Sequence, residues 1–533
     1  MRTRVFGAVL AGAALAAFGM PLSAFAQNLA LAAQAQAPAA TPAQQAPQVR
    51  RLTADEAVRL ALENNLGIRI ARMDPQIEDL NVLSARTGWT PLFTSNYQQG
   101  SNEQPPNSLL AGGTTNIVSG SMLATATVQQ ALKKGGSYSL GWDATRSTTT
   151  SFFQSFNPQL RSSFSASFTQ PLLRGWDIDN VRQQLQTSMK NREISDIDVR
   201  ETLARTTRTV RRAYMELAYS VANLEVQRQS LELARQSLRD TRARIEIGTT
   251  PPIDEIADQA EVFAREEAVI VAEAAIEQAQ DTLRALVFDP KATDFWTMRI
   301  EATDRPDLTT TAKVDVDTAV RNAISRRTDL ARARKQIELN DVNIRFFNNQ
   351  TLPDVTASVD YGLLAQGGTS VERAPGESPF LPGPIIRTTT RSFFPVLGDI
   401  FTGAPRWTAS VNISYPLGTS TQEANLARTR LQNSQLQTQI QQQELNITTQ
   451  VRQTARQVTT NQQRVQTSRA SREFAERRLD AEQRKFAAGT STNFLVFQAQ
   501  RDLAVARNNE LRAILDYAQS VIDLETVQEV PVQ

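Results

Sequence analysis

Three carboxylates, Asp254, Glu255 and Asp258, stand close together just after a Pro-Pro pair. If the chain assembles with itself, symmetry repeats them as a negative ring, which would slow anions and could bind cations. A plainer role is also open, because acidic residues in the first turn of a helix satisfy free backbone N–H groups and the helix dipole. The sequence predicts a candidate constriction where several copies meet, with helix capping as the alternative.

Basic residues offer little further chemistry. The arginines of 200–212 suggest anion binding, but a solvated helix face balanced by acids of neighbouring helices is the simpler interpretation. The chain has no His and no Cys, which excludes imidazole and thiolate metal sites, disulfides and histidine-based triads. It also has no Gly-rich phosphate loop. We therefore assign no catalytic residue, no metal site and no cofactor, and expect no enzyme.

The N-terminus has the pattern of a targeting segment. Arg2 and Arg4 precede an apolar run at 5–18, and an A-x-A cleavage signature ends at Ala26. A buried N-terminal helix is the alternative. We predict that 1–26 is a signal peptide and that the protein is exported.

The composition after the signal peptide limits the possible partners. The whole chain has 57 Lys+Arg and 55 Asp+Glu, and the signal peptide holds two of the arginines and no acid, so the remainder is balanced. That balance argues against nucleic acid, which requires a basic surface. Residues 27–51 are rich in Ala, Gln and Pro and predict a flexible leader. After residue 26 the sequence has no run of 18 apolar residues, so we expect no membrane-spanning helix there.

The rest of the chain is duplicated. Residues 52–72 resemble 314–334, and Gly248-Thr249 aligns with Gly489-Thr490 within longer similar stretches. Each half has one order: a shorter helix, strands, a very long helix, a Gly-Thr turn and another shorter helix. The predicted organisation is a first repeat at 52–288 (strands about 89–173, long helix 179–247, helix 252–288), a linker at 289–313, a second repeat at 314–528 (strands about 354–417, long helix 421–488, helix 490–528) and a tail at 529–533.

The long helices predict an extended wall. Residues 179–247 and 421–488 contain no proline, and a helix of that length measures roughly 100 Å. The shorter helices, predicted at about 53–87 and 252–288 in the first half, are each near half as long, so two of them match one long helix. Pro75 should kink the first or shift its start. Residues 421–466 have a narrow apolar seam among polar residues, which is typical of a coiled coil that is exposed to water on more than one side. A solid fibre stalk is the alternative.

Six segments alternate apolar and polar residues with a period of two, which predicts strands with one apolar face. Lengths of about 9–12 residues fit transmembrane strands between lipid and lumen, and a soluble sandwich is the alternative. The 363–405 connection contains several prolines and is expected to be irregular and mobile. Six strands cannot close a roomy barrel alone, so several copies should share one. The candidate interfacial aromatic belt, with core packing as its alternative, consists of Trp89, Tyr138, Trp142, Trp407 and Tyr415.

The chain as a whole, over roughly 52–528, resembles the TolC-like outer membrane efflux family. The duplicated halves, "SFTQPLLRG" at 167–175 and the 484–525 stretch carry the resemblance. It implies an α+β membrane protein and a homotrimer, with a long antiparallel α-helical coiled-coil tunnel in the periplasm continuous with a transmembrane β-barrel shared among protomers. It also implies contact with outer membrane lipid, a periplasmic adaptor (membrane fusion) protein and an inner-membrane pump.

The resemblance also assigns roles to the turns and shows two departures from the family. It places the adaptor-docking tip at Gly248, Thr249, Thr250, Gly489, Thr490 and Ser491, while helix C-capping is an independent role for the two glycines. Asp254 matches the family's first-repeat tip aspartate. Some relatives have acidic residues that constrict the tunnel and an arginine that latches it in the second repeat. The matching positions of this chain are Leu495, Gln498 and Ser491, so it lacks those acids and that arginine. Family members usually contribute four strands, so the extra hairpin at 119–147 either widens a trimeric barrel to 18 strands or folds outside it.

These observations favour an exit duct of a tripartite efflux or type I secretion system that conducts passively and is powered by a separate pump. The alternative is a barrel-anchored coiled-coil structural or surface protein that transports nothing.

Overall fold

The computed structural model describes residues 49–105, 116–151, 154–249, 251–304, 314–375, 383–403 and 405–529. They belong to one compact unit that starts at Val49. The predicted signal peptide and Thr250 lie outside the described residues.

Two very long helices run through the unit: α4 at Asn180–Glu246 and α9 at Thr421–Ala487, each of 67 residues. Their ends differ from the predicted ones by at most one residue. Asp179 caps α4 by accepting a hydrogen bond from the Arg182 N–H, and Ser420 forms a capping box at the start of α9. Each helix is therefore roughly 100 Å long, at 1.5 Å per residue.

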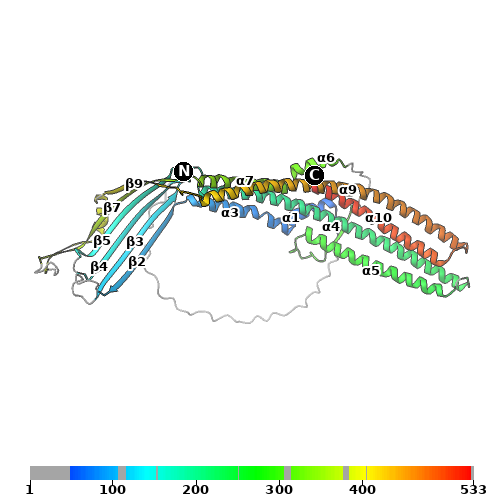
Figure 1. Ribbon diagram of the computed structural model, residues 1–533. Helices are drawn as coiled ribbons and strands as arrows, with labels where there is room; N and C mark the ends of the chain where they lie inside the picture. The colour runs from blue at the N-terminus through cyan, green and yellow to red at the C-terminus, as the bar shows by residue number, and fades with distance from the viewer. Residues whose placement is uncertain are drawn as a thin grey trace, which may run out of the picture. The chain divides into compact units, whose positions relative to one another are not determined.

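Two half-length helices return from the Gly-Thr turns. Helix α5 spans Ile253–Val287 and packs against α4, and α10 spans Asn493–Val527 and packs against both α9 and α4 (Figure 1). Because α10 contacts both long helices, it joins the two repeats.

The other two predicted helices are interrupted. The segment expected at 53–87 forms α1 at Ala54–Asn64, α2 at Leu66–Ala71 and α3 at Asp74–Arg86. Asn65 starts α2 by accepting hydrogen bonds from two backbone N–H groups, and Pro75 lies in the first turn of α3, where proline is tolerated. The corresponding segment at the start of the second repeat forms α6 at Val316–Arg326 and α7 at Thr328–Gln350. Among the described helices, none has the length and hydropathy needed to cross a membrane.

A hydrophobic core surrounds Tyr214 of α4, which is fully buried. Its hydroxyl donates to the Leu52 carbonyl at 2.9 Å and accepts from the Asp304 N–H at 3.0 Å. Strand β1 at Val49–Leu52 pairs in parallel with β6 at Arg299–Ala302 beside it. Residues 49–51 of the predicted leader therefore belong to a strand, and so do residues 299–302 of the predicted 289–313 linker. Both strands are held by the core, in which Leu52 and Ile300 are buried.

The larger sheet has seven antiparallel strands in the order β2-β3-β4-β5-β7, with β8 and β9 both paired to β7. Strand β9 pairs with Asp354–Leu363 and β8 with Gly368–Arg373, so these two strands follow each other along one edge of β7. The sheet is therefore six strands wide. The strands are β2 at Leu92–Gln104, β3 at Ile117–Ala131, β4 at Ser137–Thr149, β5 at Phe156–Pro171, β7 at Asp354–Arg373, β8 at Ile385–Arg391 and β9 at Pro405–Ser414.

Two sequence expectations are corrected here, and the structure decides between the two alternatives left open for the extra hairpin. Trp89 lies in a short 3-10 turn at Thr87–Trp89, and the first strand of the large sheet begins only at Leu92. The described part of the 363–405 connection is regular, since it contains the end of β7, β8, helix α8 at Phe393–Gly398 and a 3-10 turn, η3, at Asp399–Thr402. The extra hairpin, β3–β4, lies between β2 and β5 within the sheet and not outside it.

Candidate functional site

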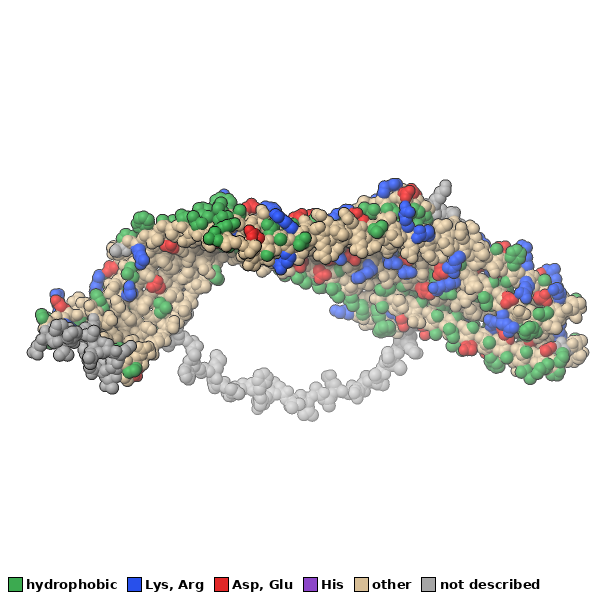
Figure 2. Space-filling view, viewed as in Figure 1, with side chains coloured by type: hydrophobic (Ala, Val, Ile, Leu, Met, Phe, Trp, Pro, Cys, Tyr) green, Lys and Arg blue, Asp and Glu red, His purple; other side chains and the backbone are tan. Residues whose placement is uncertain are grey.

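One face of the large sheet is apolar across all six strands of its width. Directly paired residues of an antiparallel sheet lie on the same face, so the register defines rows of side chains. The exposed hydrophobic side chains gather where β9 lies on the surface (Figure 2). One such row consists of Phe93, Val128, Leu140, Ala166, Tyr361 and Trp407.

The opposite face is polar. The next row on that side consists of Thr94, Thr127, Gly141, Ser165, Gly362 and Arg406. A sheet with one apolar and one polar face can separate lipid from a water-filled space. In the described part of the chain, no second sheet covers the apolar face, and Trp407 is 72% exposed. The sandwich alternative therefore lacks its covering layer in the described residues.

The five predicted belt aromatics occupy different settings. Tyr138 opens β4 and donates to Gln130 Oε1 at 2.6 Å, while Trp142 lies deeper in β4 and donates to Ser162 Oγ at 2.9 Å. Trp407 and Tyr415 are exposed near the two ends of β9. Trp89 precedes the sheet, and its carbonyl accepts a hydrogen bond from Gln130. The structure brings all but Trp142 to the sheet's margins, and Trp142 is partly covered by the segment after β8.

The two Gly-Thr turns share one geometry. Gly248 and Gly489 have φ of +78° and +75°, in the left-handed region that favours glycine. The Thr249 N–H donates to the Arg244 carbonyl and the Thr490 N–H to the Lys485 carbonyl, each at 2.9 Å. Together with the bonds from the two glycine N–H groups, these complete Schellman motifs that end α4 and α9.

The turn side chains remain available for contact. Both threonine hydroxyls also donate to the helix-end carbonyls, and Ser491 Oγ donates to Glu482 Oε2 at 2.8 Å. Thr249 and Thr490 are exposed, and Ser491 is half-buried. The described turn residues therefore cap the helices and are also exposed. The two predicted roles of the glycine turns, helix capping and adaptor docking, are compatible.

The three carboxylates of the predicted ring are not equivalent. Asp254 and Glu255 lie half-buried in the first turn of α5, where Glu255 accepts from Arg242 at 2.9 Å. Asp258 is fully buried within the single chain and accepts from Asn493 Nδ2 of α10 at 2.8 Å. Its carboxylate therefore cannot line a solvent-filled bore in this conformation. Asp254 and Asp258 are four residues apart and share one face of α5, so the difference comes from position along the helix: Asp258 lies one turn farther from the helix start, where Thr241 of α4 and Asn493 of α10 cover it.

Asp258 belongs to a buried polar cluster that sequence reasoning missed. Its partners are Asn493 and Thr241, one from each neighbouring helix. Burial, together with the nearby Asp254 and Glu255 charges, raises the pKa of Asp258 despite these hydrogen bonds. Polar residues at positions facing other helices were the available signal, but the pairing across 235 residues was not in the sequence pattern.

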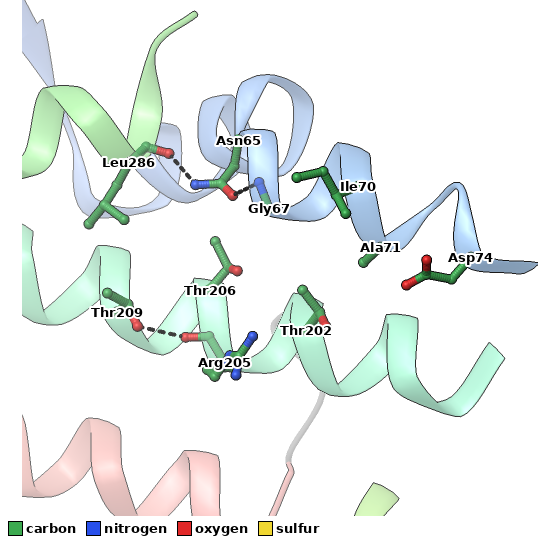
Figure 3. A pocket seen from close by; sticks show the side chains of 10 residues that line it. All are labelled: Asn65, Gly67, Ile70, Ala71, Asp74, Thr202, Arg205, Thr206, Thr209 and Leu286. Carbon is green, nitrogen blue, oxygen red and sulfur yellow. Dashed lines mark hydrogen bonds between the residues drawn. The ribbon is translucent and has the colours of Figure 1, made fainter. Parts of the chain in front are cut away.

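A surface groove of about 430 Å³ lies between α2 and α4 (Figure 3). Thr202, Thr206 and Thr209 line it on the α4 side with Arg205. Three of the other arginines singled out from the sequence pair with acids: Arg208 and Arg212 with Asp523, and Arg211 with Glu525 and Asp55. Most of the basic run is thus the solvated, neutralised face that was predicted.

The groove continues into an apolar strip on α2 and α3. Its exposed side chains are Ile70, Met73, Ile77, Leu80 and Leu83, each 53% exposed or more. An apolar strip of this kind marks a surface that is covered by another macromolecule or by membrane.

Comparison with known proteins places this geometry in a family. The chain matches solved outer membrane channels at low identity: CmeC of Campylobacter jejuni (11% identity, 89% of this chain and 85% of that one, TM-score 0.62), VceC of Vibrio cholerae (14%, 89% and 95%, 0.61) and MtrE of Neisseria gonorrhoeae (14%, 89% and 88%, 0.59). No curated protein matches the sequence. The outer membrane efflux protein model matches residues 135–287 and 319–527, well over half of the chain. The chain is therefore a member of the outer membrane efflux protein family, located in the outer membrane with its helical domain in the periplasm.

Proposed function

We propose that three copies of this protein form the exit duct of a tripartite efflux or type I secretion system, through which substrates pass passively. The observation that supports it best is the open sheet with one continuous apolar face. Its two margins, β2 and β9, have no strand partner beyond the sheet among the described residues. An unpaired edge inside a bilayer leaves N–H and C=O groups unsatisfied, so closure with other copies is required.

The strand number of the closed barrel follows from the width of the sheet. Three sheets, each six strands wide, give 18 strands, because the β3–β4 hairpin is part of each sheet. Barrels of about 16–18 strands leave a water-filled channel. The polar row that includes Thr127 and Ser165 then lines that channel, and the apolar row contacts lipid.

The helical part of each copy supplies a place for contact between copies and with partners. The groove beside α2 and the apolar strip on α3 are proposed to contact the neighbouring copy, which would remove both from water. The tip residues Gly248, Thr249, Thr250, Gly489, Thr490 and Ser491 are proposed to meet a periplasmic adaptor that brings the inner-membrane pump. Asp254 and Glu255 remain the candidates for a negative constriction, and Asp258 does not.

Disulfide trapping tests the shared barrel. Because the chain has no Cys of its own, only the introduced residues can form a disulfide. Asn96→Cys in β2 is combined in turn with Ser410→Cys and Asn412→Cys in β9, because the register places all three side chains on the polar face. Oxidation is expected to give a covalent trimer for at least one pair. The matched control combines Asn96→Cys with Ser165→Cys of β5, which lies on the same face but three strands away in the same sheet. Monomers in every pair, from protein purified from outer membranes, would exclude the β2–β9 seam.

Conduction separates the duct from the structural alternative. In planar bilayers the duct should pass ions without an energy source, and Asp254→Asn with Glu255→Gln should lower its cation selectivity. In cells, deletion should increase sensitivity to toxic compounds or block a secreted product. A protein that does not conduct, and whose loss affects adhesion alone, would instead be a barrel-anchored structural protein.

A further inference from the structure

The segment between β8 and β9 folds back onto the apolar face of the sheet. Val396 of α8 and Ile400 of η3 are 1% and 3% exposed and pack with Trp142, Phe164 and Leu363. The register places these three in one row of the apolar face, next to the row that contains Tyr361 and Trp407. The segment Phe393–Thr402, called the collar below, therefore lies on the side of the sheet that faces lipid and not the channel.

The sheet has a recess where the collar packs. Beneath it the row of directly paired residues is Ala144, Ser162 and Ala365, all small and all buried. Beyond it lies Gly367, where an added Cβ would stand 2.3 Å from Val396 Cγ2. The rows toward the helices have large side chains at the same face, such as Leu363 and Tyr361. The small residues make room for the collar at this height only.

The height of the collar on the sheet matches a membrane border. Strand β7 begins at Asp354, whose carboxylate pairs with Arg174, so the hydrocarbon region begins beyond that ion pair. A tilted strand crosses the hydrocarbon in about 9–11 residues. Counting from Asp354, the far border falls at about Leu363–Ala365, where the collar packs and β9 begins.

The outward side of the collar is apolar, and no described part of the chain covers it. Phe394 and Phe401 are 80% and 81% exposed, although Val396 and Ile400 beside them are buried. Aromatic side chains at the border of the hydrocarbon are typical of membrane-interface anchors.

We infer that the collar is a lipid-binding anchor that inserts Phe394 and Phe401 into the outer leaflet around the barrel. This inference rests on the proposed barrel, because it requires the apolar face to contact lipid. The occupant is the acyl-chain and headgroup boundary of the bilayer. A second copy of the chain is the competing occupant, and the experiment distinguishes the two.

The test uses single Cys residues, each labelled with a fluorescent bimane group, in protein reconstituted into lipid vesicles. Labels at Phe394→Cys and Phe401→Cys are compared with Trp407→Cys on the apolar row and Ser165→Cys on the polar face. Lipids brominated on their acyl chains report contact with the bilayer, and aqueous iodide reports contact with water. We expect brominated lipid to reduce emission at 394, 401 and 407, and iodide to reduce it at 165.

Each other outcome overturns the inference in a different way. Quenching by iodide alone at 394 and 401, with lipid quenching kept at 407, would leave the barrel standing and refute the collar. Protection from both quenchers at 394 and 401 would assign them to a contact between copies. No lipid quenching at 407 would refute the proposed barrel and the collar together.

A second variant tests whether the recess positions the collar. Gly367→Val should displace Val396, so the label at 394 should lose lipid quenching while the label at 407 keeps it. Gly362→Val is the matched control, because a Cβ at that position would make only ordinary contacts, the nearest at 3.7 Å. Unchanged lipid quenching at 394 in Gly367→Val would show that the recess does not position the collar.

Discussion

Replacing Asp258 by Asn should stabilise the helical tip at neutral pH. Asp258 Oδ2 and Asn493 Oδ1 are buried acceptors that no described donor reaches. In Asp258→Asn the amide nitrogen replaces Oδ2 and should donate to Asn493 Oδ1, while the remaining Oδ1 still accepts the bond from Asn493 Nδ2. The change also removes a buried charge that Asp254 and Glu255 disfavour. The interface between α5 and α10 should therefore open less often.

The burial of Asp258 sets both the size of the expected stabilisation and its dependence on pH. A buried hydrogen bond or an unpaired buried group is worth about 1–3 kcal/mol, which changes an opening constant about 5- to 150-fold. Because the folded-state pKa of Asp258 is raised above 3.8, the folded state binds the proton more tightly than the unfolded chain does. Stability from this site is complete below the ordinary pKa and is lost as the pH rises through the raised one. The difference in the free energy of opening between wild type and Asp258→Asn should therefore become smaller at acidic pH.

Amide hydrogen exchange at the starts of α5 and α10 measures this opening locally. After correction for intrinsic exchange rates, Asp258→Asn should exchange more slowly than wild type at neutral pH. Asp258→Ala should exchange faster, because it leaves the Asn493 amide and the Thr241 hydroxyl without their acceptor. The half-buried Asp254→Asn serves as a control with little expected change. Unchanged or faster exchange in Asp258→Asn would refute the reasoning.

Three further predictions concern stability in detergent solution. Gly248→Ala and Gly489→Ala should each cost about 1 kcal/mol, read from thermal unfolding, because φ is positive while the space around Cβ is open. Tyr214→Phe should cost about 1–3 kcal/mol, read from the denaturant midpoint, because two buried hydrogen bonds to its hydroxyl are lost. Lys335→Met should cost less than about 1 kcal/mol, since its ion pair with Glu193 is partly exposed. The Lys335 hydrogen bond lowers the pKa of Glu193, so this stability is present above pH 4.5, is lost as the pH falls through the lowered pKa, and should shrink in high salt. A salt-independent effect of Lys335→Met would contradict the ion-pair account.

The sequence predicts most of the architecture because its periods are local. Alternation with a period of two placed Phe93, Leu140 and Trp407 on one face of their strands, and the register joins them into one row. The same local signal existed for β8, whose Ile385-Ile386 pair and three threonines are typical of a strand. The surrounding prolines led to the expectation of an irregular loop instead.

Non-local contacts account for the remaining differences. The β1–β6 pair joins residues 250 positions apart, and neither four-residue strand has enough alternation to be recognised alone. Asp258 and the collar are similar cases. A carboxylate in an early turn of a helix suggests a solvent-facing charge, until the helices packed on both sides are known.

The sequence by itself determined the duplication, the proline-free long helices, the glycine turns and the two-faced strands, because propensity and periodicity act between near neighbours. Only the tertiary structure decided which carboxylate is buried, that the extra hairpin widens the sheet, and that Val396 packs into a recess of small residues. Burial and register depend on contacts between residues far apart in the chain, and a local pattern leaves many such contacts equally compatible.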